Sequence, residues 1–230
     1  MRNYVKEALI LAVAIIALGV IIYSAAIAFR DKDRVVSVRG LAEMEVPANK
    51  VIWPISYAET GNDIPTLYKI VSEKNAVILK FLKDNGLADS EITASAPSVS
   101  DMEVDGGYST NNKFRYSMSS IVTVATDKVD LVRKLVLKQA ELIGRGIAIN
   151  GNSYVDFEYT DLNKIKPKMI EEATRNARAA AQKFAKDSDS KLGKIRSAVQ
   201  GQFSIDNRDQ NTPYIKNVRV VTVVNFALED

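Results

Sequence analysis

The 230-residue chain contains no cysteine and no histidine. Without cysteine it can form no disulfide framework and offers no thiolate nucleophile. The lack of both residue types also excludes the usual Cys/His zinc sites and every Ser-His-Asp or Cys-His catalytic group. We therefore expect no enzyme activity, no catalytic residue, no cofactor and no metal site.

Excess charge of one sign is also missing. Lys and Arg number 31 against 28 Asp and Glu, a net charge of +3, so the sequence gives no reason to expect a nucleic-acid partner. Hydrophobic residues make up 47% and charged residues 26%, which is ordinary globular composition and excludes wholesale disorder. The length suits one large domain or two small ones.

One long apolar run stands out near the start of the chain. Ala8–Phe29 carries no charge, and only Gly19 and Ser24 fall outside the apolar set. As a helix the run would be about 33 Å long, enough to cross a hydrocarbon core of about 30 Å. The sequence therefore predicts a membrane-targeting segment.

Two interpretations fit this apolar segment. A signal peptide would be cleaved near Ala28, after the small-residue stretch 24–28, and would leave a soluble exported protein. An uncleaved anchor would continue to the charged residues that follow Phe29, and we favour it because a cleavable core is usually shorter. We thus expect a short basic N-terminus (1–7), a transmembrane anchor (8–29), a charged linker (30–34) and one extracytoplasmic domain (35–230).

The rest of the chain alternates strand-like and helix-like segments. This pattern predicts an α+β fold, with mostly antiparallel sheets covered by about three helices and preceded by one N-terminal transmembrane helix. The expected strands are Val35–Val46, Lys50–Thr60, Glu91–Met102, Arg115–Thr126, about Ala148–Tyr159, Lys194–Phe203 and Lys216–Leu228. The expected helices begin after caps at Asn62-Asp63 and Asp127, and a third covers Lys166–Ser188.

Periodicity also predicts which residues are buried. Val51, Trp53, Ile55 and Tyr57 alternate along one strand face. The first helix should bury Ile64, Leu67, Tyr68, Val71, Val77, Ile78, Phe81 and Leu82, and the second Val129, Val132, Leu135, Val136, Leu142 and Ile143. The third helix should carry a stripe of Met169, Ala173, Ala177, Ala180 and Phe184. The valine-rich final strand is expected to be central and buried on both faces.

The sequence resembles a known family along most of this region. The segments Glu172–Ala185, Lys191–Ile195 and Gln200-Gly201, together with Val36–Glu43, are similar to the signature of the SIMPL-domain family of exported bacterial proteins. The likeness covers about residues 35–228. The family usually places glycine after the long helix, where this chain has Asp189, a residue type that tolerates the left-handed conformation.

The resemblance implies a domain on the outer side of the cytoplasmic membrane, in the periplasm or outside the cell. It also implies a homo-oligomer, in some members a ring or channel, and a connection to tolerance of envelope or oxidative stress. It supplies no catalytic residue. We therefore expect a membrane-tethered envelope protein that acts by binding or self-assembly. The alternatives are a ligand- or polymer-binding module and an enzyme that uses carboxylates, such as Glu43 and Glu45, or a Ser-Lys pair.

Two tyrosines are the candidate contact residues. Tyr108 and Tyr214 stand in long polar loops, about 101–114 and 204–216, and could touch a partner or a sister subunit, or fold back on their own loops.

Other motifs have simpler explanations than a functional site. Asp187, Asp189 and Lys191 lack EF-hand spacing, and Gly144-Arg145-Gly146 is typical of a helix end. Arg175, Arg178, Lys183 and Lys186 suit a solvated helix face better than a ridge for anionic polymers.

Overall fold

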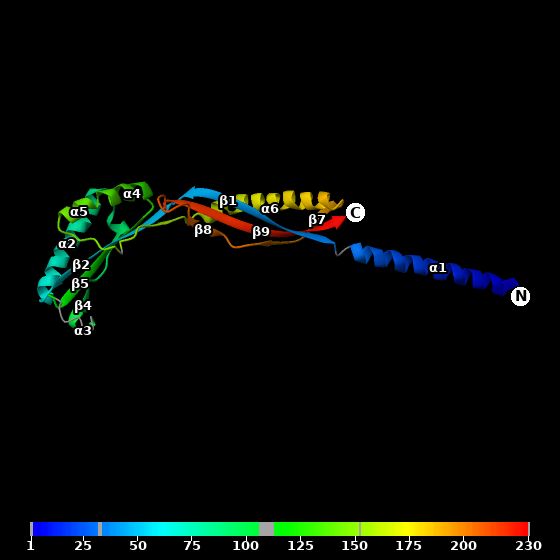
Figure 1. Ribbon diagram of the computed structural model, residues 1–230, viewed down its shortest axis with the longest axis horizontal. Helices are drawn as coiled ribbons and strands as arrows, with labels where there is room; N and C mark the ends of the chain where they lie inside the picture. Colours follow the sequence, from blue (N-terminus) through cyan, green and yellow to red (C-terminus); the bar gives the residue numbers. More distant parts are fainter. Residues whose placement is uncertain (1, 32–33, 106–112, 152, 230) are drawn as a thin grey trace. The chain divides into compact units, whose positions relative to one another are not determined.

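The computed structural model describes residues 2–31, 34–105, 113–151 and 153–229 (Figure 1). Its contacts divide the chain into two compact units. Unit 1 comprises residues 1–44, 163–204 and 218–230, and unit 2 comprises 45–162 and 205–217. The fold is α+β with antiparallel sheets, as the sequence predicts.

The N-terminal helix α1 spans Arg2–Asp31. It contains Glu7–Ala25, a stretch long and apolar enough to cross a membrane, and no part of this stretch is buried. A helix of this kind suits either a single-pass anchor or a signal sequence. The predicted apolar segment is thus confirmed as a helix.

Unit 2 is built on a sheet with the strand order β3-β5-β2-β6, in which β4 also pairs with β5. The strands are β2 (Lys50–Gly61), β3 (Ile92–Ala94), β4 (Ser98–Asp101), β5 (Tyr116–Thr126) and β6 (Asp156–Glu158). The long central pair runs antiparallel, with Val51 opposite Thr126 and Gly61 opposite Tyr116. The single strand predicted over Glu91–Met102 is wrong: Pro97 lies in the break between β3 and β4, and a short helix, α3 (Met102–Asp105), follows.

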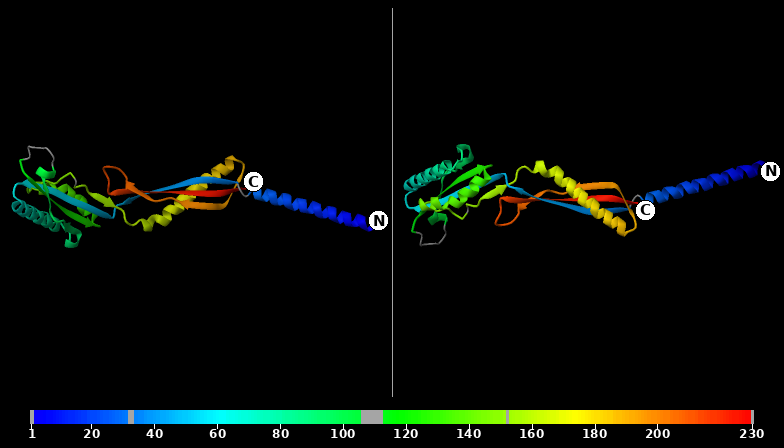
Figure 2. Two further views of the ribbon diagram at one scale, coloured as in Figure 1. Left: turned by 90° about the horizontal axis from the view of Figure 1, so that it is seen from below. Right: turned by 90° about the horizontal axis from the view of Figure 1, so that it is seen from above.

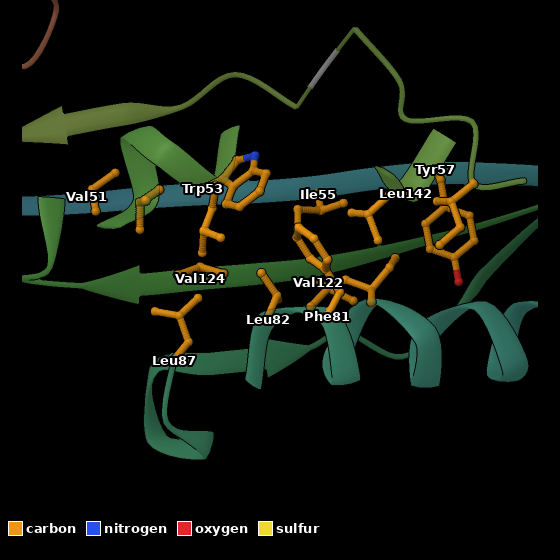
Figure 3. Packing of buried hydrophobic residues seen from close by; sticks show 14 of the residues in the cluster. Val51, Trp53, Ile55, Tyr57, Phe81, Leu82, Leu87, Val122, Val124 and Leu142 are labelled. Atoms are coloured by element: carbon orange, nitrogen blue, oxygen red, sulfur yellow. The ribbon is translucent and has the colours of Figure 1, made fainter. Parts of the chain in front are cut away.

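Besides the short α3, unit 2 contains the helices α2 (Ile64–Asp84), α4 (Val129–Lys138) and α5 (Ala140–Gly144), with a 3-10 turn, η1, at Asp89–Glu91. Figure 3 shows the core, in which Val51, Trp53, Ile55 and Tyr57 form a row along β2. All four are fully buried, as the alternation predicts. Phe81 and Leu82 of α2 and Leu142 of α5 belong to the same cluster (Figure 3).

Some boundary predictions in unit 2 need correction. Ile64 and Tyr68 of α2 and Ile143 of α5 are exposed rather than buried, because each lies at the margin of its apolar stripe. The predicted second helix is broken at Gln139, and it begins after Lys128 without a side-chain cap from Asp127. The cap at Asp63 is confirmed, since its carboxylate accepts a hydrogen bond of 3.0 Å from the Thr66 amide.

A small polar network crosses the core of unit 2. The Tyr57 hydroxyl donates to the Val71 carbonyl at 2.8 Å and lies 2.9 Å from Asn75 Oδ1, while Asn75 Nδ2 donates to Ser120 Oγ at 3.0 Å. Burial raises the pKa of the Tyr57 hydroxyl to about 12. The network joins β2, α2 and β5 through groups that would be costly to leave unpaired.

Unit 1 contains a sheet with the order β1-β9-β7, to which β8 adds beside β9. The strands are β1 (Val35–Pro47), β7 (Lys191–Gln200), β8 (Ser204–Asn207) and β9 (Ile215–Glu229), and the division between the units falls within β1, β8 and β9. β9 is central, as predicted. It is not buried on both faces: buried residues alternate with partly buried or exposed ones, because one helix covers a single face.

That helix is α6 (Leu162–Asp187), which crosses the strands of unit 1 diagonally (Figure 2). Its buried stripe is Met169, Ala173, Ala177, Ala181 and Ala185, at strict four-residue spacing. The predicted Ala180 and Phe184 lie beside this stripe, and Phe184 is exposed. A four-residue step slightly exceeds one helical turn, so the stripe drifts around the helix and favours Ala181 and Ala185.

Gly40 of β1 lies directly under this stripe. A Cβ atom built on Gly40 would stand 1.8 Å from the Ala173 carbonyl oxygen and 2.7 Å from the Ala177 amide nitrogen. Asn176 fixes the same approach, since its side-chain amide donates to the Leu41 carbonyl at 2.8 Å. Helix and strand therefore meet backbone to backbone at this point.

The end of α6 confirms the expectation for Asp189, which has a φ of 51° in the left-handed region. The Ser190 amide donates to the Ala185 carbonyl at 2.9 Å, and the Asp189 amide donates to the Lys186 carbonyl at 3.2 Å. These two bonds form a Schellman motif with aspartate in the position that glycine usually takes. The helix can therefore end cleanly without the family's glycine.

Replacing Gly40 by Ala should lower the free energy of unfolding by about 3 kcal/mol, because the new methyl group meets helix backbone that cannot rotate away. Thermal unfolding of the purified full-length protein measures the effect. The control is Gly144→Ala, where an added Cβ meets nothing within 4 Å. Equal effects of the two substitutions would show that α6 does not approach β1 as described.

Candidate functional site

A groove in unit 2 is the candidate site. Its volume is about 790 Å³, within the range of small-molecule sites. Three parts of the chain line it: α4, Gly151 with the residues from Ser153 into β6, and the loop before β9. The lining residues are Asp130, Arg133, Lys134, Val136, Leu137, Gly151, Ser153, Tyr154, Val155, Phe157, Asn211, Pro213 and Tyr214.

Helix α4 supplies the charged wall of the groove. Its core side buries Val132 and Leu135, and this orientation turns Arg133, Lys134 and Leu137 away from the core. Leu137 is 83% exposed, an unusual position for a leucine on an otherwise well-patterned helix. The helix thus presents two cations, two apolar side chains and the acid Asp130 to the groove.

The segment before β6 supplies an aromatic wall. Tyr154 is 66% exposed, while Phe157 of β6 is buried in the core. Ser153 holds the segment against β2, since its hydroxyl accepts from the Ser56 amide at 2.9 Å and lies 3.3 Å from the Ser56 carbonyl. Tyr154 therefore projects from backbone that is tied to the sheet.

The loop before β9 supplies the third wall and is organised by one carboxylate. Asp209 accepts hydrogen bonds from the Asn211 amide at 2.8 Å, the Thr212 amide at 2.8 Å, the Thr212 hydroxyl and Arg208 Nε at 3.0 Å. The Thr212 hydroxyl, followed by the Arg208 guanidinium, lowers the pKa of Asp209 to about 2. This loop positions Asn211, Pro213 and Tyr214.

Tyr214 joins the walls of the groove. Its ring lies edge-on to Phe157, with centroids 6.2 Å apart and an interplanar angle of 72°. The Arg133 guanidinium stacks on the Tyr214 ring, 3.5 Å from its centroid. The Tyr214 carbonyl also accepts a hydrogen bond of 2.9 Å from the Ala48 amide. Aromatic and backbone contacts therefore fix Tyr214 in place.

Ion pairing leaves the groove with positive charge. Arg133 Nη1 lies 3.0 Å from Asp130 Oδ1, so the only acidic side chain among the lining residues is already paired. Lys134 is a second cation. The lining thus combines apolar and aromatic walls with a cationic side, an arrangement suited to binding.

Only one of the two predicted contact residues, Tyr108 and Tyr214, lies among the described residues. Tyr214 is half-buried, lines the groove and packs against the core of unit 2. Tyr108 lies outside the described residues. Whether either tyrosine touches a partner stays a prediction.

The sequence reasoning missed Arg133, Leu137 and Tyr154. Leu137 did carry a signal, since it is an apolar residue outside the predicted stripe of its helix. Tyr154 had none, because it lies in a predicted strand where an aromatic residue is expected. Arg133 gains its place only through contact with Tyr214, 81 residues away in sequence.

The other motifs do not form a site. Glu43 pairs with Arg219 at 3.6 Å and Glu45 with Arg208 at 3.4 Å, and both carboxylates are exposed. Gly146 has a φ of 79° just past α5, as expected of a helix end, whereas Gly144 is the last helical residue. In the described part of the chain, no group of three or more acidic side chains could hold a metal ion.

The proposed basic ridge of α6 is a shallow surface. Arg175 and Arg178 line a hollow of about 400 Å³ together with Glu171 and Thr174. Arg178 lies 6.0 Å from the Phe226 ring centroid. The mixture of acid, hydroxyl and cations matches the solvated helix face that the sequence favours.

Comparison with protein families gives a match over most of the chain. The sequence model of the SIMPL family, which is described as "Protein of unknown function (DUF541)", matches residues 36–222 of the chain. The match includes all three walls of the groove and the whole of α6. No curated protein is significantly similar to the chain.

Replacing Asp209 by Ala should expose the Asn211 and Thr212 amides to hydrogen exchange, because both lose their acceptor. Protection factors, corrected for intrinsic exchange, measure the effect, and Asp206→Ala on the neighbouring strand is the control.

The lowered pKa of Asp209 predicts how this protection depends on pH. The ionised carboxylate stabilises the folded loop at pH values above the usual pKa of 3.8, and this stabilisation is lost as pH falls through about 2. Protection should therefore persist at pH 4. Loss of protection between pH 5 and pH 4 would contradict this role of Asp209.

Proposed function

Because the chain belongs to the SIMPL family, we propose that it is a membrane-tethered protein of the cell envelope whose extracytoplasmic domain works by binding. The groove of unit 2 is the observation that carries this proposal. Binding at the groove would serve tolerance of envelope or oxidative stress, the role that the resemblance implies.

Exposed apolar side chains support binding at the groove. Leu137 and Tyr154 project into solvent at its walls, although both stand on backbone that the core holds in place. An apolar hollow of this size, bordered by a few charged groups, is typical of a ligand site. A bound partner would remove both side chains from water and so stabilise the complex.

The residue types present support a non-enzymatic role. Neither cysteine nor histidine is available, and the two carboxylates considered for acid-base chemistry each pair with an arginine at the surface. The groove's own acid, Asp130, is paired as well.

The tether is the second part of the proposal, and we infer that α1 remains attached. The chain extracted from membranes should then have the intact mass of residues 1–230. A mature chain that begins at Phe29 would contradict the anchor and leave a soluble exported protein.

Photo-crosslinking in intact cells tests the groove. A benzophenone amino acid at Leu137 or Tyr154 should capture a bound molecule, which mass spectrometry of the isolated adduct would identify. The control is Tyr68, an exposed aromatic residue on α2 of the same unit. Adducts of equal yield at all three positions would contradict a specific site.

Self-assembly is a second candidate function, favoured by strand β7. This strand forms an edge of the unit 1 sheet, and its residues 194–200 are all exposed, with Val199 at 64%. An exposed edge can pair with another chain, although Lys194 and the register shifts around Ile195 oppose unspecific pairing. The crosslinking residue at Val199 should capture a second copy of this protein, and monomeric adducts alone would contradict assembly through β7.

A further inference from the structure

We propose that the groove of unit 2 takes a small amphipathic anion, namely a carboxylate on a medium-length apolar chain. The inference rests on the proposed function, since it specifies the ligand of the same groove. Three features of the groove favour this ligand: the charge balance of the lining, the position of the apolar side chains and the contact between Arg133 and Tyr214.

The charge balance favours an anion. Two cations, Arg133 and Lys134, line the groove against one acid, Asp130. Asp130 is engaged with Arg133 at 3.0 Å, so it leaves Lys134 uncompensated by any acid of the lining. A carboxylate placed at this wall would gain a charge-assisted hydrogen bond.

The groove does not suit a cationic ligand, although it contains aromatic rings. An aromatic ring attracts a cation through its face. The face of Tyr214 already carries the Arg133 guanidinium at 3.5 Å, and Lys134 would repel a second cation. The chain's own arginine thus occupies the face of Tyr214 that a ligand cation would need.

The remaining walls favour an apolar body. Leu137 and Tyr154 are exposed, and Phe157 belongs to the core beneath the groove. Contact with an alkyl chain would remove Leu137 and Tyr154 from water without requiring new polar partners. The volume of about 790 Å³ suits a small ligand better than a folded partner.

Three probes with the same eight-carbon body test the proposal: octanoate, 1-octanol and octyltrimethylammonium. Their affinities for the full-length protein in lipid nanodiscs are measured by calorimetry, with empty nanodiscs as the blank. Octanoate should bind about fivefold more tightly than octanol, and the cation should bind most weakly. Higher salt should reduce the preference for octanoate.

Substitutions in the groove test whether octanoate binds there. Lys134→Glu should weaken octanoate about tenfold and reverse the preference between the charged probes, whereas Lys138→Glu, on the same helix outside the groove, should change it less than twofold. Leu137→Asn should weaken octanoate and octanol alike, about fivefold, with the exposed Ile143→Asn as its control. Both target side chains are exposed, so these changes leave the fold intact.

Equal affinity for the three probes, or no binding above the blank, would overturn the proposal. So would an effect of Lys138→Glu as large as that of Lys134→Glu. These results leave the proposed function standing if the crosslinking residues at Leu137 and Tyr154 still capture a molecule in cells. If those adducts are also absent, the groove is not a binding site and both proposals fail.

Discussion

The backbone contact between α6 and β1 is the constraint on which unit 1 depends. Gly40 has no side chain, and the residues that face it on the helix are alanines, so the two backbones meet with almost no intervening atoms. Alanines at four-residue spacing make this approach possible, because a larger side chain at Ala173 or Ala177 would push the helix away from β1. One helix can therefore cover a sheet face with few large residues, and the core of unit 1 depends on proximity more than on side-chain volume.

Unit 2 reaches its stability by the opposite route. Its core contains large side chains, among them Trp53, Tyr57 and Leu142, and a polar network joins three elements inside it. This core matters for the groove. Leu137 and Tyr154 are held in their exposed positions because neighbouring residues on the same segments are anchored to the core and to the sheet. The groove is thus a consequence of well-fixed backbone, which lowers the entropic cost of ordering a bound molecule.

Much of the fold follows from local patterns in the sequence. Alternation fixes the buried face of β2, and the apolar stripes locate α2, α4, α5 and α6 to within a few residues. The predictions fail where tertiary contacts decide which residues are buried. Phe184 is an aromatic residue of the kind found in cores, yet the drift of the alanine stripe around the helix leaves it exposed. The groove could not be foreseen in the same way, because Arg133 and Tyr214 come together only through the folded chain. Local periodicity carries no information on such pairs.

The division of the chain into units has a consequence for its biosynthesis. Unit 1 draws on three separate segments, and the central strand of its sheet, β9, follows all of its neighbours in the sequence. The neighbours β1 and β7 have no central partner until β9 has been made, whereas all of unit 2 precedes Val218. Unit 1 must therefore remain partly open until β9 has been synthesised, and a product truncated before Val218 would expose the alanine stripe and two unpaired strands to chaperones and proteases.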